Sequence, residues 1–410
     1  MTVIKPFRAI RPTRDKAYLV ATRPFYAYDK TVLKAKLEHN PYTFLHVINP
    51  EFNTEDKTEP NSPERFQKIR NKFDEFIREG IFMQDHEDCF YLYRQTREDH
   101  TYIGVIGGAS IDQYNSGNIK KHEDTISERE EVFSNFLNIV AFNVEPVLLF
   151  HRKHDGLDDL YAEIMVERPE YEFSSWDRVK HEVWVIKSPE QIEKIQRYYH
   201  EIERVYIADG HHRCASSARY SNSIKDKTSR NQDLFLACFI SEEKLKILDY
   251  NRLVRDLNGL TNEAFLEKIA ENFIVTKIIT KNVSPLGLHE ISMYLAGQWY
   301  KLTVKEGSFD RNHPVYRLDT HILTKNLLDP VLNIADLKTD QRINFIHGRL
   351  GMEGIQEAVD KGKYAVGFGL FPVPVEHLKR VSDENLIMPP KSTWIEPKLR
   401  SGLTIFPLDE

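Results

Sequence analysis

Residues 183–220 read VWVIKSPEQIEKIQRYYHEIERVYIADGHHRCASSARY, and this stretch decides the fold. A β-branched run at 183–187 predicts a strand, after which Ser188 begins a capping-box pattern and Pro189 takes the first position of a helix. A second strand is expected at 205–208, followed by a polar turn and a helix rich in small residues. The order strand, helix, strand predicts a parallel pair joined by a right-handed crossover.

The whole chain is long enough for more than one domain. Its 410 residues fit two or three domains with sizeable cores. We expect a mixed α/β fold with an N-terminal α/β domain over residues 1–240 and a C-terminal α+β domain over residues 241–410. The Pro-rich segment 388–399 is unsuited to a helix, yet Trp394 and Leu399 predict that it docks on the body of the protein.

Local patterns predict several further elements. An apolar stripe that begins after Pro63 predicts a helix. The runs at 90–94 and 102–111 predict strands, and the glycines within the second run indicate a bulge or the close approach of a neighbour. The first 49 residues are expected to be irregular chain with short strands, among them residues 17–20 and 44–48.

Charge and composition exclude some classes of protein. The net charge of −6, from 56 basic and 62 acidic residues, argues against a general nucleic-acid binder. The longest apolar run, Leu234 to Ile240, is far shorter than the ~20 residues of a membrane helix. The N-terminus lacks the apolar stretch of a signal peptide, and the three cysteines have no metal-ligand spacing. We therefore expect a cytoplasmic protein with no membrane partner.

The turn Asp209-Gly210-His211-His212-Arg213 is the sharpest candidate site. A helix N-terminus offers unpaired N–H groups and a positive dipole end, and Arg213 can bind a phosphate or carboxylate through two parallel hydrogen bonds. Asp209 could hold Mg²⁺ or orient a histidine, or it could cap the helix while the histidines pack on the turn. Because two histidines and an arginine follow directly, we favour an anion site. Beside a bound anion, His211 and His212 are expected to be protonated and therefore poor bases.

A second candidate is the segment Lys120-Lys121-His122-Glu123-Asp124-Thr125. Glu123, next to His122, could act as a general base. Lys121 and Thr125 could contact a phosphate. The local sequence alone favours a solvated charged loop.

A third and weaker set lies near the C-terminus. Lys391, Ser392 and Lys398 could form a phosphate clamp or belong to ordinary surface. The remaining histidines have no mutual spacing that indicates a metal, and no Walker loop or zinc signature occurs.

Taken together, these motifs resemble the bacterial and archaeal family known as domain of unknown function 1015. The resemblance covers nearly the whole chain, with two departures. Cys214 stands where an aromatic is expected after the arginine, and Phe25-Tyr26-Ala27-Tyr28 replaces a Pro-Tyr-Asp-like run. The segments that carry the resemblance are Pro6–Pro12, Asn40–Val47, Gly117–Thr125, Ile207–Arg213, Met388–Thr393 and Pro397–Leu399.

The Asp209–Arg213 turn also resembles the phosphate-binding turn of the ParB/sulfiredoxin-like superfamily, which includes free serine kinases. The resemblance implies a ParB/sulfiredoxin-like core, with nucleotide phosphates (ATP or ADP) at Gly210 to Arg213 and Mg²⁺ near Asp209. It also implies that a separate glutamate, here Glu123, activates the hydroxyl of the acceptor. Sulfiredoxin chemistry would need a cysteine between the glycine and the histidine, and here His211 follows Gly210 directly.

The sequence thus leads to two hypotheses of different class. The first is an enzyme that binds a nucleotide and Mg²⁺ and transfers phosphate to a small hydroxyl-bearing metabolite, such as free serine or a similar amino acid. The second is a nucleotide-binding regulatory protein without turnover. Nucleotide consumption in the presence of an acceptor separates the two. DNA binding is disfavoured by the net charge and by the lack of a recognisable helix-turn-helix.

Overall fold

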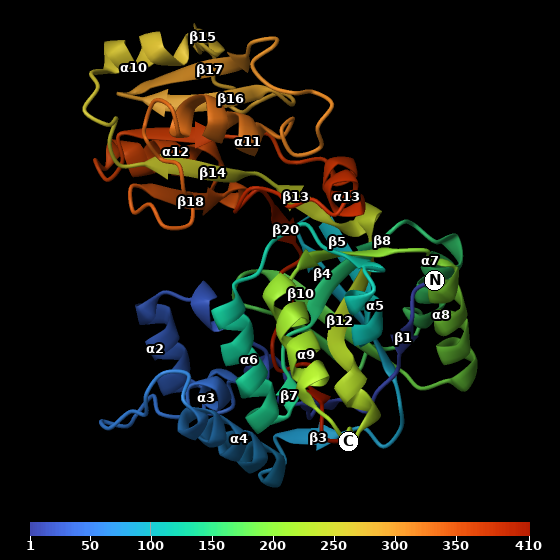
Figure 1. Cartoon of the computed structure of the whole chain (residues 1–410). Coiled ribbons are helices and arrows are strands. Elements are labelled where there is room, and N and C mark those ends of the chain that lie inside the picture. The colour runs from blue at the N-terminus through green and yellow to red at the C-terminus, as the bar shows by residue number, and fades with distance from the viewer. Residues whose placement is uncertain (99) are drawn as a thin grey trace. The chain divides into compact units, whose positions relative to one another are not determined.

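The computed structural model describes residues 1–98 and 100–410, which form two compact units (Figure 1). Unit 1 comprises residues 1–245 together with 397–410, and unit 2 comprises residues 246–396. The sequence predicts a division at 240/241. The units differ from that division mainly in residues 397–410, which group with unit 1.

Unit 1 mixes helices and strands. Its strands are β1 (Ile4–Lys5), β2 (Ile10–Pro12), β3 (Phe82–Gln84), β4 (Phe90–Arg97), β5 (His100–Ser110), β6 (Ile119–Lys120), β7 (Phe142–Asn143), β8 (Val147–His151), β9 (Tyr171–Ser174), β10 (Val179–Ile186), β11 (Val205–Asp209), β12 (Leu234–Ser241) and β21 (Phe406–Pro407). Its helices are α1 (Ala17–Val20), α2 (Lys30–His39), α3 (Leu45–Ile48), α4 (Pro63–Arg78), α5 (Ile111–Asn115), α6 (Ser127–Val140), α7 (Asp155–Ile164), α8 (Pro189–Glu201) and α9 (His211–Ser223), with short 3₁₀ turns η1 (Phe25–Ala27), η2 (Arg230–Asp233) and η3 (Glu242–Lys244).

The main sheet of unit 1 has the strand order β6-β11-β8-β12-β5-β4-β10-β9, with β1 paired to β5. The predicted parallel pair of β10 and β11 is wrong. Both edges of β10 are taken by β4 and β9, and four strands separate β10 from β11. Six strands at ~4.8 Å spacing place the two about 24 Å apart. The 13-residue helix α8, roughly 20 Å long, is suited to span that distance rather than to join neighbouring strands.

Glycines let the central strand β5 pack tightly between its neighbours. A Cβ at Gly104 would lie 2.7 Å from the carbonyl oxygen of Phe239 on β12, and one at Gly107 would lie 2.9 Å from Ile4 and Phe90. The sequence indicates either a bulge or the close approach of a neighbour at these glycines. In the structure, the neighbouring strand β12 approaches closely.

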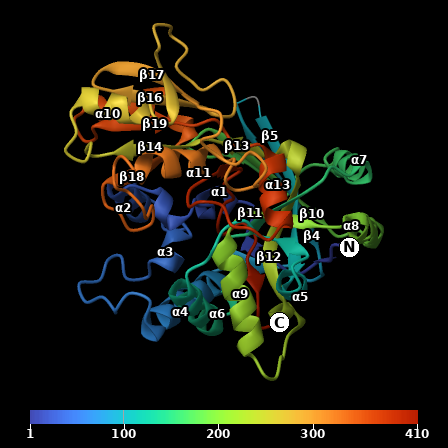
Figure 2. The ribbon, with the colours of Figure 1, turned by 45° about the horizontal axis from the view of Figure 1, so that its top comes forward.

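Two helices of unit 1 replace predicted strands. Residues 17–20 and 45–48 form the one-turn helices α1 and α3, because runs this short carry no period that separates helix from strand. The helix from Pro63 is confirmed as α4, which buries Phe66 and Phe73. The capping box at Ser188 is absent, since its side chain makes no cap hydrogen bond although Pro189 does begin α8. Figures 1 and 2 show α6 and α9 side by side.

Unit 2 is built around a second, antiparallel sheet of order β15-β17-β16-β19-β14-β18, beside the short pair β13–β20. One face carries α12 through Met352 and Ile355, and the other carries α10 and α11 through Phe265 and Ile322. Its elements are β13 (Lys246–Leu248), β14 (Tyr250–Val254), α10 (Asn262–Ile269), β15 (Phe273–Lys277), β16 (Glu290–Leu295), β17 (Gln298–Val304), α11 (Asp319–Leu323), the π turn η4 (Thr324–Leu328), β18 (Ile343–His347), η5 (Gly348–Leu350), α12 (Gly351–Asp360), β19 (Val366–Gly369), α13 (Val375–Asp383) and β20 (Trp394–Glu396).

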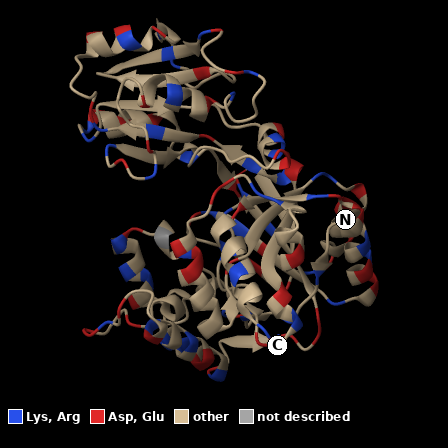
Figure 3. Cartoon of the chain, in the orientation of Figure 1, with Lys and Arg blue, Asp and Glu red and all other residues tan. Residues whose placement is uncertain are grey.

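The mixed α/β class expected from the sequence is confirmed. Acidic and basic residues are interspersed over the helices of both units (Figure 3). None of the helices in the described part of the chain combines the length and apolar character that crossing a membrane requires.

The contact at Gly104 generates a stability prediction. Gly104→Ala should lower the free energy of unfolding by about 1–3 kcal/mol, because the added methyl group meets the β12 backbone, which cannot rotate away. Urea denaturation followed by circular dichroism measures the change. Gly287→Ala is the matched control, since a Cβ there meets nothing within 4 Å. Equal unfolding midpoints for the two variants would contradict the prediction.

Candidate functional site

The candidate site lies where β11 ends and α9 begins. Gly210 joins them with φ +105°, a left-handed conformation that side chains other than glycine rarely adopt. A Cβ at this position would lie 3.0 Å from the guanidinium atoms of Arg213. Glycine is therefore needed twice, for the backbone angle and for the room that lets Arg213 fold back over the turn.

Arg213 bonds to its own chain. Its Nη1 donates to the carbonyl oxygens of Pro146 (2.6 Å) and Glu145 (3.2 Å) and contacts the Glu145 carboxylate at 3.0 Å. Its Nη2 lies 3.4 Å from Asp209 Oδ2. The guanidinium thus ties the turn to the start of β8, and the two parallel bonds to a phosphate expected from the sequence would compete with these acceptors.

Asp209 is held as an anion by two cations. Lys398 Nζ lies 3.5 Å from its carboxylate, and Arg213 Nη2 lies 3.4 Å from the same oxygen. Burial alone would raise the pKa of Asp209, but the charges of Lys398 and Arg213 outweigh it and hold the pKa below its ordinary value. The side chain is still 34% exposed, so a ligand can reach it.

The second candidate segment meets this turn because of strand pairing. Strand β6 runs parallel to β11, with Ile119 opposite Val205 and Lys120 opposite Tyr206. Parallel strands end at the same edge of a sheet, so the residues after β6 lie beside the residues after β11. Glu123 Oε2 accordingly lies 3.6 Å from His211 Nδ1, although 88 positions separate the two residues in the sequence.

His122 and His211 form a buried pair. Their rings meet edge to face with centroids 4.5 Å apart, and the backbone N–H of His122 donates to His211 Nε2 at 3.4 Å. Because Nε2 accepts, the neutral His211 ring carries its proton on Nδ1, which faces Glu123. Within the described part of the chain, neither ring nitrogen of His122 has a hydrogen-bond partner, although the residue is 1% exposed.

Burial sets the protonation of His211 and His122 in this structure. Burial, only partly offset by Asp209, lowers the pKa of His211 to about 3, and burial together with His211 lowers the pKa of His122 to about 3. Both rings are therefore neutral at pH 7. Protonation of His211 and His212 beside a bound anion stays a prediction, and the burial of His211 opposes it.

Lys121, His212 and Thr125, which were also predicted for the site, have different surroundings. Lys121 is exposed and lies close enough for its charge to lower the pKa of His211. His212 Nε2 accepts a hydrogen bond from the backbone N–H of Ile126 at 3.3 Å. Thr125 bonds to the Glu130 carboxylate on α6.

Lys391 and Ser392 belong to unit 2 and have partners there. The Ser392 hydroxyl bonds to Thr320 and to the Pro389 carbonyl, and Lys391 Nζ lies 5.5 Å from the centre of the Tyr250 ring. Lys398, the third member of this set, belongs to unit 1 and lies against the Asp209 turn.

Glu145 also belongs to this cluster, although the sequence did not single it out. The Glu145 side chain is 16% exposed, and burial raises its pKa although Arg213 opposes the shift. The sequence signal is a carboxylate two positions before the apolar run at 147–150, and that pattern is too common to single out.

The described residues contain no group of three or more His, Cys, Asp or Glu side chains that could hold a metal ion. A metal at Asp209 would therefore need oxygen ligands from a bound molecule, which is how Mg²⁺ usually binds beside phosphates.

Comparison with known proteins matches the chain to a family. A family model described as "Protein of unknown function (DUF1015)" matches residues 4–321. No curated protein matches the chain.

Among solved structures, the chain is similar to a free serine kinase in complex with AMP, at 13% identity and a TM-score of 0.38, covering 75% of this chain and 92% of that one. It is also similar to SbnI with a C-terminal truncation from Staphylococcus aureus (11% identity, TM-score 0.41, 74% and 87% covered). A conserved hypothetical protein from Pyrococcus furiosus gives 13% identity and a TM-score of 0.35, with 75% and 96% covered.

The two neutral histidines predict a loss of stability in acid. Their pKa values are lower in the folded state than the ordinary 6.5, so below pH 6.5 the unfolded chain binds more protons and stability falls as the pH falls towards 3. Replacing His122 by Leu removes one such group and its two unpaired nitrogens. The loss between pH 6 and pH 4 should shrink by about 2 kcal/mol, measured by urea denaturation at each pH.

His86→Gln provides the control, because His86 is exposed and its replacement should leave the acid dependence as it is. An unchanged acid dependence in His122→Leu would show that His122 is already protonated in the folded protein.

Proposed function

The chain belongs to the family described as protein of unknown function (DUF1015), and from this premise we propose that it is a nucleotide- and Mg²⁺-dependent phosphotransferase acting on a small hydroxyl-bearing metabolite. One observation carries the proposal. The ionised Asp209, the N-terminus of α9, the partly exposed Glu123 and the ammonium group of Lys398 meet at one edge of the unit 1 sheet. These are the groups that phosphoryl transfer requires: anion donors, a metal ligand and a base.

The phosphates of the nucleotide would bind at the start of α9. The first N–H groups of a helix have no partner within it, and the helix dipole adds positive charge. Gly210 has no side chain to cover this end of the helix, and Lys398 and Lys121 supply cations beside it. Arg213 would act mainly through its bonds to Glu145 and Pro146, which hold the turn in place.

Mg²⁺ would bind at Asp209 together with phosphate oxygens. A single ionised and partly exposed carboxylate fits this arrangement, because Mg²⁺ in phosphoryl-transfer sites takes one or two protein carboxylates and fills its other positions with phosphate and water. When bound, the ion neutralises the phosphate charge that builds up during transfer.

Glu123 would accept the proton of the acceptor hydroxyl. As the acceptor oxygen forms its bond to the terminal phosphorus, the bond to the nucleotide's bridging oxygen breaks, and the proton moves to the Glu123 carboxylate. The Glu123 side chain is 39% exposed, which leaves it open to an acceptor. His211 directs its Nδ1–H towards Glu123, and His122 packs against the His211 ring, so both histidines would serve as positioning residues.

Free serine or a similar hydroxyl amino acid is the acceptor that we propose. The support is the residue pattern of the turn, since Asp209-Gly210-His211-His212-Arg213 matches the Asp-Gly-His-x-Arg turn of the free serine kinases.

Glu123→Gln separates catalysis from binding. The variant should bind ATP or ADP with Mg²⁺ within a few-fold of the original affinity and lose roughly 10²–10⁴ in turnover, the range for removal of a general base. Calorimetry measures the affinity, and phosphorus NMR of a reaction with a mixture of hydroxyl amino acids measures the turnover. Asp124→Asn is the control, because it removes the exposed neighbouring carboxylate and should change neither quantity.

Two results would contradict this role of Glu123. An equal loss of binding and turnover would make it a structural residue. Nucleotide binding by the unchanged protein, with no phosphorylated product from any acceptor, would instead favour a nucleotide-binding regulatory protein without turnover.

Lys398→Met tests the phosphate site separately. Because Lys398 is one of the two cations against Asp209, its loss should weaken nucleotide binding by about tenfold, the effect of losing one charged hydrogen bond of ~1.5 kcal/mol. Thermal shift and calorimetry with ATP and Mg²⁺ measure the loss. Lys187→Met, an exposed lysine elsewhere in unit 1, should leave the affinity unchanged.

A further inference from the structure

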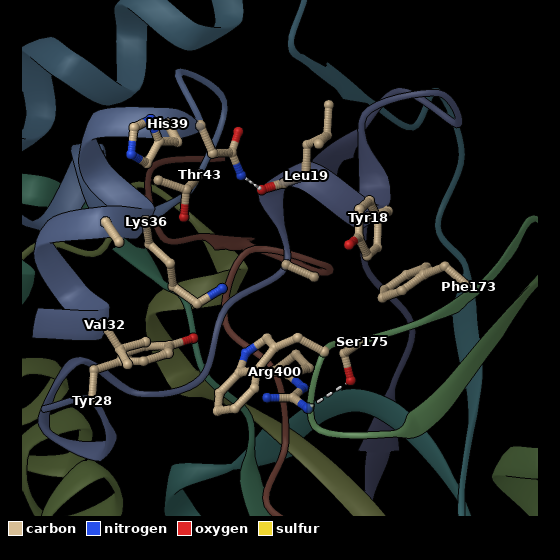
Figure 4. Close-up of a pocket in the computed structure, with 14 residues that line it drawn as sticks. Tyr18, Leu19, Tyr28, Val32, Lys36, His39, Thr43, Phe173, Ser175 and Arg400 are labelled. Atoms are coloured by element: carbon tan, nitrogen blue, oxygen red, sulfur yellow. Dashed lines mark hydrogen bonds between the residues drawn. The ribbon is translucent and has the colours of Figure 1, made fainter.

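Unit 1 contains a cavity of about 410 Å³ that the proposed reaction does not use (Figure 4). Its walls come from α1, α2 and the segments around residues 40–43 and 173–176, and Arg400 also lines it. This volume lies within the range of small-molecule sites. The lining combines aromatic rings with cations, which is the composition of a ligand pocket rather than of a packing defect.

The aromatic residues of the cavity are unusually exposed. Tyr18 is 54% exposed and Trp176 is 55% exposed, although such side chains normally bury most of their surface. Phe173 meets Tyr18 edge to face at 5.9 Å between ring centres. Tyr28 is fixed, because its hydroxyl bonds to Thr22 Oγ1 at 2.7 Å and accepts from the Arg23 N–H at 2.8 Å. The rings thus form a preformed apolar surface open to a ligand.

Lys36 brings a positive charge into this cavity without a carboxylate partner. Its Nζ lies over the Tyr28 and Trp176 rings, at 5.5 and 5.7 Å from their centres, and within the described part of the chain no carboxylate oxygen lies within 4 Å of it. Figure 4 shows the side chain directed into the cavity. Burial, Arg400 and Arg23 lower the pKa of Lys36, and only Asp177 opposes them, so an added anion would relieve an unfavourable charge.

Asp177, the acid whose charge acts on Lys36, already has partners of its own. Arg400 Nη2 donates to both of its carboxylate oxygens, at 2.6 and 2.8 Å, and Ser175 Oγ donates to one of them at 2.6 Å. Arg400 Nε donates to His181 Nε2. In the described residues, Arg400 Nη1 makes no hydrogen bond, so the cavity offers a guanidinium N–H as well as the Lys36 ammonium. With Lys36, Arg400 and Arg23 against Asp177, the local charge is positive.

We propose that this cavity is a second ligand site, which takes a small organic anion with a flat ring, the ring stacking among Tyr18, Phe173 and Trp176 and the anionic group binding Lys36 and Arg400. The ligand's chemistry follows from the walls. A neutral ring compound leaves the Lys36 charge unsatisfied, and a compact anion without a ring leaves the aromatic surface in water.

Phenyl phosphate and benzoate are the test ligands, and calorimetry on the full chain measures their binding. Both anions should bind saturably, at least tenfold more tightly than neutral benzyl alcohol, while benzylamine should not bind. Lys36→Met keeps the apolar stem of the side chain and should weaken the anions at least tenfold without changing benzyl alcohol binding. Lys34→Met, on the same helix but 66% exposed, is the matched control and should change nothing.

Three results would overturn the proposal. The first is binding of phenyl phosphate within twofold in Lys36→Met, and the second is equal affinity for benzyl alcohol and the anions. The third is stoichiometric displacement of phenyl phosphate by AMP, which would make the cavity part of the nucleotide site rather than a second site. Nucleotide binding at the Asp209 turn is measured in the same protein by the Lys398→Met experiment, so the two proposals fail independently.

Discussion

Arg213 lies at the centre of the contacts that hold the candidate site in unit 1. Its guanidinium bonds to the carbonyls that precede β8 and to Asp209, so the ends of two antiparallel neighbours, β8 and β11, are held at one separation. This is possible only because Gly210 adopts φ +105° and leaves room above the turn. The direction of the α9 N-terminus, the ionisation of Asp209 and the approach of Glu123 all depend on the same turn.

The sequence predicted individual helices and strands better than it predicted which strands pair. The stripe after Pro63 has a clear helical period, and the apolar run at 205–208 is bounded by a predicted helix and a polar turn. Both elements formed as predicted. The partner of β11 was missed, because strand pairing depends on the whole sheet and α8 is long enough to bypass four strands. The short runs at 17–20 and 44–48, predicted as strands, form helical turns at 17–20 and 45–48, because four or five residues are too few to show a period.

The sequence predicted several residues of the site better than it predicted their charge states. The sequence selected His122, Glu123 and the Asp209 turn, and the parallel pairing of β6 with β11 explains why they meet. The partners of the charged side chains could not be predicted from the sequence. Glu145 lies 68 positions from Arg213, and burial, which sets the pKa of His211, is a property of the folded chain. Sequence patterns therefore indicate which groups are available, and packing determines their charge.

The division of the chain has a consequence for the order in which the protein is made. Unit 2, residues 246–396, interrupts unit 1 in the sequence, and Lys398 and β21 follow it. At ~5–20 residues per second, a ribosome spends roughly 8–30 s on unit 2. Throughout that time the nascent unit 1 has the Asp209 turn with Arg213, but it lacks Lys398, the second cation beside Asp209, and the strand that pairs with β7. Unit 2 can complete its fold during synthesis, whereas unit 1 must wait for the segment that comes after it.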